Sequence, residues 1–177
     1  LLLDESLLTK AARPQRVLIV GGGPGGLEAA RVAALRGHRV ALAEAGPTLG
    51  GALLAAKRAP RMQGIADITD WLEREIYRLG VDVRTGSFIE AGDVIADAPD
   101  HVIVATGATS RGNGLQASDP GRKPSGCELA HVCDVNDLLY RPAESLVGRS
   151  AVVFDDVGHY EAVAAAEHLI ERGAAVT

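Results

Sequence analysis

Three glycines and one glutamate in this chain have the residue types and the spacing of a nucleotide site. Gly21, Gly23 and Gly26 follow the pattern G-x-G-x-x-G, and Glu44 comes later in the same stretch. The first glycine permits a tight turn, the second lets the backbone approach a pyrophosphate, and the third lets a helix pack closely on a strand. The Glu44 carboxylate can accept hydrogen bonds from a ribose diol. This combination predicts a site that binds a dinucleotide.

The residues around the glycines predict the elements that would hold this site. Residues 17–20 form an apolar strand before the turn, residues 27–36 a helix after it, and residues 39–43 a second strand that ends at Glu44. The N-terminus of such a helix offers free N–H groups and a partial positive charge to phosphates. A glycine turn with a purely structural role is the alternative interpretation, which the strand, the helix and the acid together disfavour.

The composition excludes several classes of partner. The 177 residues carry 18 Lys and Arg against 23 Asp and Glu, which gives a net charge of −5. Nucleic acids and anionic membranes both attract clustered basic residues, so we expect neither as a partner. No apolar run reaches the roughly 18 residues that a membrane span needs. The opening residues also lack the features of a secretory signal.

The cysteine spacing and the first residue bear on the compartment, on metal binding and on whether the chain is complete. Cys127 and Cys133 lack the C-x-x-C spacing of a redox or metal site, so we expect a cytoplasmic protein with no metal in this chain. No Ser-His-Asp or Cys-His arrangement is evident, and we assign no catalytic residue. Because the chain lacks an initiating Met, we expect it to be a piece of a longer protein.

The middle of the chain continues an alternation of helices and strands. Apolar residues recur at offsets of three and four over residues 65–79, which predicts an amphipathic helix ended by Gly80. The other expected segments are a partly helical stretch at 52–63, a strand at 81–85 with 86–89 as its continuation or partner, a buried strand at 101–105, an irregular connection at 108–130 and a short helix at 135–140. We therefore predict an α/β fold with a Rossmann-like domain.

The last part of the chain repeats the pattern of the first. Residues 150–154 match the first strand and residues 161–172 match the first helix, which predicts a second Rossmann-like unit. Its turn lacks the three glycines and places Asp155 and Asp156 where a pyrophosphate would lie. These carboxylates would repel phosphate at close range, so we expect a degenerate unit that holds no dinucleotide. The expected division is a tail or linker at 1–14, an incomplete nucleotide-binding domain at 15–110, a connection at 111–147 and the start of the degenerate, NAD(P)-binding-like domain at 148–177.

The glycine turn, Glu44, the run Leu49-Gly50-Gly51, the run Val104-Ala-Thr-Gly107 and the altered second turn together resemble one family. Residues 14–177 are similar to the C-terminal part of the trimethylamine dehydrogenase and 2,4-dienoyl-CoA reductase group, which are old yellow enzyme-related flavoproteins. The resemblance implies two domains of the glutathione reductase type, of which the first binds FAD in the reductases and ADP in the amine dehydrogenases. It also implies an FMN-binding barrel and a 4Fe-4S cluster, both expected in the missing part of the parent protein.

The resemblance assigns cofactor-binding roles to particular positions. Gly21, Gly23, Pro24 and Gly26 would contact the pyrophosphate through their backbone, and Glu44, with Ala45 beside it, would bind the adenosine ribose. The remaining assignments are Gly50 and Gly51 alongside the phosphates, the Ile89 backbone near the adenine, and Ala105, Thr106 and Gly107 at the ribose-phosphate. From the sequence alone, Arg58 and Arg61 are further candidates to face the phosphates across the Gly50–Gly51 loop, and solvated surface is the alternative for both.

Three functions follow as expectations. The first is an ADP- or FAD-binding fragment of a multi-domain, flavin-dependent oxidoreductase of the amine dehydrogenase type, acting on N-methylated amines. The second is an FAD-carrying electron-transfer segment of an NAD(P)H-dependent reductase that is similar to dienoyl-CoA reductase. The third is a non-catalytic nucleotide-binding module. In the first two, the expected partners are the nucleotide and the missing FMN-barrel domain, and the resemblance leaves room for a homodimer of the parent.

Overall fold

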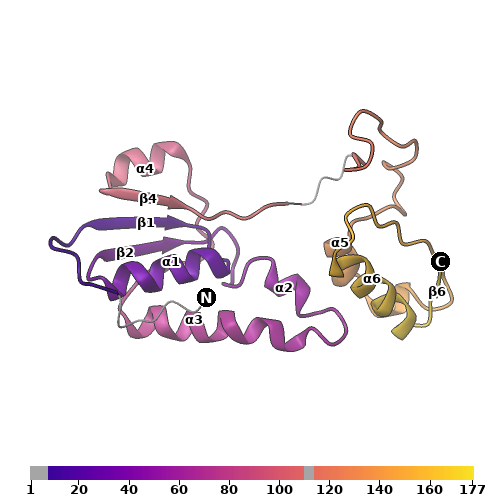
Figure 1. The fold of residues 1–177 in the computed structure, drawn as a ribbon, viewed down its shortest axis with the longest axis horizontal. Helices are drawn as coiled ribbons and strands as arrows, with labels where there is room; N and C mark the ends of the chain where they lie inside the picture. The colour runs from indigo at the N-terminus through magenta and orange to yellow at the C-terminus, as the bar shows by residue number, and fades with distance from the viewer. Residues whose placement is uncertain (1–7, 110–113) are drawn as a thin grey trace. The chain divides into compact units, whose positions relative to one another are not determined.

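The computed structural model describes residues 8–109 and 114–177 (Figure 1). Residues 1–7, in the expected tail, and 110–113, around the start of the expected connection, lie outside the described residues. The described chain divides into two compact units. The first unit contains the described residues up to Leu54 together with Ala66–Gly107, and the second contains Ala55–Ile65 together with the described residues of Ala108–Thr177.

A parallel sheet forms the centre of the first unit. Its four strands are β1 (Arg16–Val20), β2 (Arg39–Ala43), β3 (Asp82–Arg84) and β4 (His101–Val104), in the order β3-β2-β1-β4. Helices α1 (Pro24–Leu35) and α3 (Asp67–Arg78) lie on one side of this sheet, and α4 (Ala91–Asp97) lies on the other (Figure 1). Parallel strands joined by helices are the arrangement of a Rossmann-like domain, so the predicted α/β class is confirmed.

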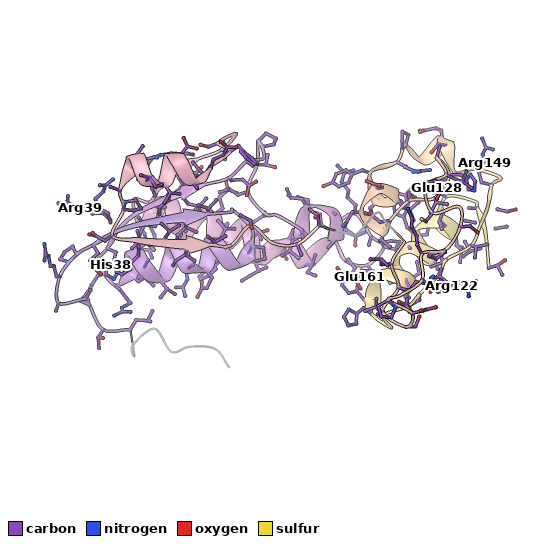
Figure 2. All side chains as sticks on the ribbon, turned by 90° about the horizontal axis from the view of Figure 1, so that it is seen from above. His38, Arg39, Arg122, Glu128, Arg149 and Glu161 are labelled. Atoms are coloured by element: carbon purple, nitrogen blue, oxygen red, sulfur yellow. The ribbon has the colours of Figure 1, made fainter. Side chains whose placement is uncertain are left out.

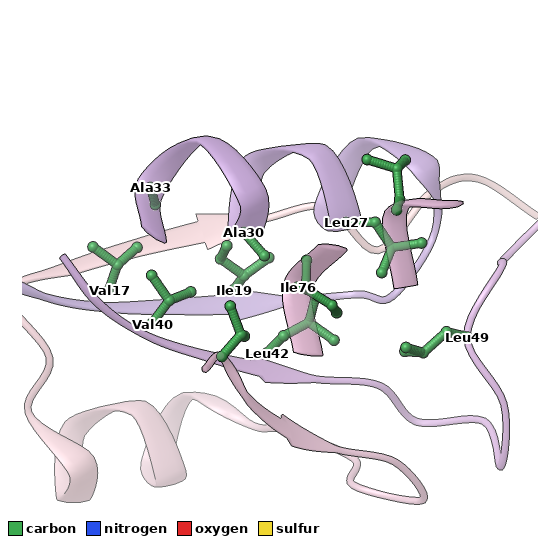
Figure 3. Close-up of a cluster of buried hydrophobic side chains, with 11 residues drawn as sticks. Val17, Ile19, Leu27, Ala30, Ala33, Val40, Leu42, Leu49 and Ile76 are labelled. Carbon is green, nitrogen blue, oxygen red and sulfur yellow. The ribbon is translucent and has the colours of Figure 1, made fainter. Parts of the chain in front are cut away.

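The core of the first unit lies between the sheet and the two helices. Alternate residues of β1 and β2 point to this side, and small residues of α1 let the helix approach them closely (Figure 3). Ile19, Leu27, Leu42 and Ile76 are buried to 0% exposure. The whole cluster consists of Val17, Ile19, Leu27, Ala30, Ala33, Val40, Leu42, Leu49, Leu72, Ile76 and Val81. Charged side chains such as Arg39 are exposed (Figure 2).

The segment after β3 differs from the expected one. The prediction that residues 86–89 continue or pair with the strand is wrong, because these residues form a loop. The N–H groups of Gly86 and Ser87 donate instead to the carbonyl oxygens of Gly46 and Glu44, each at 2.8 Å. The loop is thereby held against the end of β2. Helix α4, which the sequence analysis missed, follows, with Glu90 and Asp93 forming a reciprocal capping box at its start.

The second unit contains a small parallel ladder and two main helices. Helices α5 (Val135–Tyr140) and α6 (Tyr160–Glu171) pack together, and β5 (Ser150–Ala151) pairs with β6 (Ala175–Val176). The strand expected at 150–154 is thus shorter than predicted. A short helix, α2 (Leu53–Ala56), and two 3-10 turns, η2 (Gln63–Ala66) and η3 (Ala143–Ser145), complete the described elements. Among the described helices, none has the length and apolar character to cross a membrane.

Candidate nucleotide-binding site

The glycine turn connects β1 to α1 at the carboxyl end of the sheet. Gly23 is the N-cap of α1, with an extended backbone, and Pro24 occupies the first helical position. The first-turn N–H groups of a helix have no partner within the helix, and the helix dipole adds a partial positive charge at that end. Open α/β sheets bind their ligands in a crevice at the carboxyl ends of the strands. The turn therefore has the location and the polarity of an anion site.

Close backbone contacts require glycine at two positions of the turn. Gly21 has a φ of +111°, and a Cβ there would lie 2.3 Å from the carbonyl oxygen of Ala105. A Cβ on Gly26 would lie 1.9 Å from the carbonyl oxygen of Gly21. Gly23 is different, because a Cβ there would meet only the Cα of Gly51, at 3.7 Å. The protein itself leaves room beside Gly23, which fits a position where a ligand approaches the backbone.

Glu44 lies at the end of β2 with both carboxylate oxygens directed at backbone N–H groups. Its Oε2 accepts from Gly22 at 2.6 Å, and its Oε1 accepts from Gly46 at 2.7 Å. A carboxylate has about four acceptor positions, so two remain for hydroxyl groups of a ligand. The sequence analysis missed Gly22 and Gly46 as partners of this acid. Glu-x-Gly at the end of a strand is the signal that could have revealed Gly46.

Two further loops reach the glycine turn. The N–H of Gly50 donates to the carbonyl oxygen of Gly22 at 2.9 Å, and a Cβ on Gly51 would lie 2.8 Å from the Cα of Gly23. Residues 105–107 approach from the end of β4, where the Ala105 N–H donates to the Val20 carbonyl oxygen at 2.8 Å. The structure thus brings together four of the segments that the sequence analysis selected: the glycine turn, Glu44, the Gly50–Gly51 loop and residues 105–107.

The other residues predicted to bind the cofactor are Ala45 and Ile89 in the first unit and Arg58 in the second. Ala45 is exposed beside Glu44, and Ile89 is half-buried in the loop that Ser87 anchors to the Glu44 carbonyl oxygen. Arg58 belongs to the second unit, where its guanidinium lies 4.2 Å from the ring centroid of Tyr140. Its expected role at the phosphates stays a prediction.

In the second turn, which precedes α6, the carboxylates of Asp155 and Asp156 accept hydrogen bonds from backbone N–H groups. Asp155 Oδ1 accepts from the N–H groups of Val157 at 3.0 Å and Gly158 at 2.9 Å. Asp156 accepts from the N–H groups of Ala117 and Ser118. Hydrogen bonds from Gly158 and Val157 hold the pKa of Asp155 below its usual range. The side chain of Ser118, followed by the N–H groups of Ser118 and Ala117, lowers the pKa of Asp156 in the same way. Both groups are therefore carboxylates at neutral pH.

Comparison with known proteins gives consistent matches. Residues 15–154 match a family described as pyridine nucleotide-disulphide oxidoreductase. The chain is 38% identical over 162 residues to N,N-dimethylglycine/sarcosine dehydrogenase of Chromohalobacter salexigens, covering 92% of this chain and 23% of that protein. It is 36% identical over 172 residues to NADH oxidase of Thermoanaerobacter brockii, covering 97% of this chain and 25% of that protein.

A solved structure extends the match to three dimensions. The 6-hydroxypseudooxynicotine amine oxidase of Pseudomonas geniculata N1 aligns with a TM-score of 0.85 and 34% identity, over 94% of this chain and 25% of that chain. The chain thus spans about a quarter of the length of the relatives it matches. The segment described here therefore corresponds to one part of much longer oxidoreductases.

Proposed function

The chain belongs to the pyridine nucleotide-disulphide oxidoreductase family, and from this premise we propose that it binds the ADP moiety of a nucleotide within a flavin-dependent oxidoreductase. The observation that carries the proposal is the convergence of the glycine turn, Glu44, the Gly50–Gly51 loop and residues 105–107 at one end of the sheet. FAD, where it is the nucleotide bound, supplies a flavin that accepts and passes on electrons. The protein residues position the cofactor and take no chemical step themselves.

Each part of the proposed site has a physical task. The backbone N–H groups at the start of α1 bind the pyrophosphate, next to Gly21, Gly23, Pro24 and Gly26. Glu44 accepts hydrogen bonds from the ribose while it continues to hold the turn through Gly22 and Gly46. In this proposal Ala45 borders the ribose and the Ile89 backbone borders the adenine. Gly50 and Gly51 line the phosphates, and Ala105, Thr106 and Gly107 border the ribose-phosphate.

Of the possible parents, we favour an enzyme of the amine dehydrogenase type that acts on N-methylated amines. The carboxylates of Asp155 and Asp156 support this choice, because Asp155 already occupies two backbone N–H groups of the second turn and both charges would repel a phosphate there. The similarity to a dimethylglycine/sarcosine dehydrogenase supports it as well. The similarity to an NADH oxidase supports the alternative, an NAD(P)H-dependent flavin reductase with FAD in this chain.

In this proposal the parent protein contains further domains beside the two represented in this chain. We place the nucleotide-binding domain at 15–110, the connection at 111–147 and the degenerate unit at 148–177. The parent carries FMN and a 4Fe-4S cluster in its other domains, works in the cytoplasm and can form a homodimer. None of these features requires a metal ligand or a catalytic residue in the present chain.

Two glycine variants test the nucleotide site. Gly23→Ala adds a methyl group where the protein leaves space and the pyrophosphate would approach, so we expect ADP affinity to fall at least tenfold, about 1.4 kcal/mol. Gly25→Ala is the matched control, because a Cβ there meets no atom within 4 Å. Isothermal titration calorimetry with ADP measures the affinity, and thermal unfolding checks that both variants remain folded. Unchanged ADP binding by folded Gly23→Ala would overturn the proposed site.

Identifying the nucleotide that is bound to the purified chain distinguishes an amine dehydrogenase-type parent protein from a flavin reductase. The purified chain is denatured, and any released compound is identified by absorbance and mass. FAD supports the reductase alternative and an electron path through this chain. ADP without flavin supports the amine dehydrogenase type, with a structural role for the site.

A further inference from the structure

Residues Ala55–Ile65, here called the clasp segment, form part of the second unit although they precede most of it in sequence. Ala55 and Ala59 pack in one buried cluster with Leu139 of α5 and Ala164 of α6. Ala59 is completely buried. Small side chains at these positions let the clasp segment approach the two helices closely. The contact is therefore a packed interface within the second unit.

Two arginines of the clasp segment add polar contacts. Arg61 pairs with Glu167 of α6 at 3.1 Å, and the Arg58 guanidinium lies over the Tyr140 ring of α5. Arg61 also has a φ of +61°, a conformation that a residue with a side chain adopts only when its surroundings impose it. The clasp segment carries a third cation, Lys57. All charged side chains of the clasp segment are therefore cationic.

His168 of α6 is the group that this closed position buries. Its side chain lies one helical turn after Ala164 and is only 1% exposed. Within the described part of the chain, neither ring nitrogen makes a hydrogen bond of normal geometry, although the Arg58 backbone carbonyl faces the ring. An imidazole that is buried without a partner is stable only as the neutral form, because a buried charge needs a compensating group.

The charges around His168 do not supply that compensation. On its own helix, Glu167 is paired with Arg61, and Glu171, whose charge acts to raise the pKa of His168, is exposed and outweighed by burial. Arg172, also near the ring, donates to the His168 carbonyl oxygen at 3.2 Å. Burial, followed by the charge of Arg172, lowers the pKa of His168 below its ordinary value. The clasp segment offers no carboxylate to the ring, because its charged side chains are Lys57, Arg58 and Arg61.

We propose that His168 makes the closure of the clasp segment on α5 and α6 sensitive to protons. The clasp segment closes over the neutral imidazole and is released when the ring takes up a proton. Protonation places a cation near Arg172 and gives the ring two N–H groups, of which only one can be directed at the Arg58 carbonyl oxygen. Release gives the charged ring access to water and separates it from the cations of the clasp segment.

The direction of the effect follows from proton linkage. The open form exposes His168, whose ordinary pKa is about 6.5, and the closed form binds a proton less readily. The ratio of closed to open molecules is therefore constant above about pH 6.5. Below that pH it falls by up to about tenfold per pH unit, until the pH reaches the lower pKa of the closed form.

Amide hydrogen exchange of the full chain tests the proposal between pH 5 and 8. Hydrogen bonds inside the clasp segment, such as Ala59 N–H to the Ala56 carbonyl oxygen at 3.0 Å, make its closure visible as protection. After correction for the intrinsic rates, wild-type protection of this segment is expected to fall below pH 6.5. His168→Leu, which cannot take up a proton, is expected to give protection that does not change with pH. His159→Gln, at the exposed start of α6, is the control and keeps the wild-type dependence.

Two further measurements keep the test decisive if His168→Leu fails to fold. An NMR titration of the wild-type protein must give His168 a midpoint below 6.5, with loss of protection in the same range. Glu167→Gln removes the pair with Arg61 and is expected to lower protection at every pH without removing the loss below pH 6.5. An ordinary midpoint, protection that is flat with pH in the wild type, or unchanged dependence in folded His168→Leu would overturn the proposal.

Discussion

Glu44 shows how one side chain can serve the fold and the ligand together. Its two oxygens fix the backbone at Gly22 and Gly46, which places the glycine turn, the end of β2 and the following loop in one rigid arrangement. A ribose-binding acid that is already held by two donors loses little rotational freedom when the ligand arrives. The residue therefore contributes to affinity partly through its orientation in the free protein.

Glu44→Gln tests the structural half of this role. The amide keeps an acceptor toward one N–H group but turns its NH₂ toward the other, so one hydrogen bond is lost and two donors face each other. We expect the free energy of unfolding to fall by about 1–3 kcal/mol. Urea unfolding measures it, and Glu73→Gln on α3 makes the same charge change elsewhere. Equal stability of the two variants would contradict the role given to Glu44.

At the scale of elements, helix α3 packs one apolar face against the sheet and α1 in the core of the first unit. Ile76 is completely buried there and packs with residues of β1, β2 and α1. Since α1 and α3 are on the same side of the sheet, the position of α1, and with it the helix N-terminus at the glycine turn, depends on this packing (Figure 1).

Ile76→Ala is expected to lower the free energy of unfolding by about 2–5 kcal/mol, because it leaves a cavity under the sheet. The next residue, Tyr77, is 54% exposed, and Tyr77→Ala is expected to change the stability by less than about 0.5 kcal/mol. Chemical unfolding followed by circular dichroism compares the two. A loss for Ile76→Ala no larger than for Tyr77→Ala would mean that α3 does not anchor the core.

The elements of the first unit were predictable where local patterns dominate. The strand at 39–43 has the predicted bounds, and the helices expected at 27–36 and 65–79 are α1 and α3 with slightly different ends. Caps and strand ends depend on tertiary contacts, which explains these differences. The loop at 86–89 was mistaken for a strand because its hydrogen bonds go to Gly46 and Glu44, residues far away in sequence.

The site was partly predictable for the same reason. The glycine spacing identifies the turn, and the acid after β2 identifies Glu44, because both are local features. No local pattern shows that Ala55–Ile65 packs with α5 and α6, which come much later in the sequence. His168 was given no role from the sequence, since a single histidine in a helix shows nothing about what covers it. Only the structure reveals its burial.

At the scale of the whole molecule, each unit has a core of its own. The cluster around Ile19 and Ile76 belongs to the first unit, whereas the clusters around Leu169 and Ala59 belong to the second. Separate cores predict that damage to one unit leaves the local stability of the other largely unchanged.

Leu169→Ala tests this independence. Leu169 is 5% exposed, and its truncation is expected to cost the second unit about 2–5 kcal/mol. Hydrogen exchange should therefore accelerate in α6 and β6 and remain nearly unchanged in β1 and β2. Ile76→Ala provides the mirror-image control. Equal acceleration in both units after either substitution would show that they unfold as one.

The last strand of the sheet has a practical consequence for the isolated chain. β4 ends the order β3-β2-β1-β4, and Val102, Ile103 and Val104 are 39%, 38% and 72% exposed. A strand that is apolar and has one side unpaired is a template for another strand. A second copy of the chain can therefore add a strand at this edge, and we expect aggregation at high concentration to begin at β4.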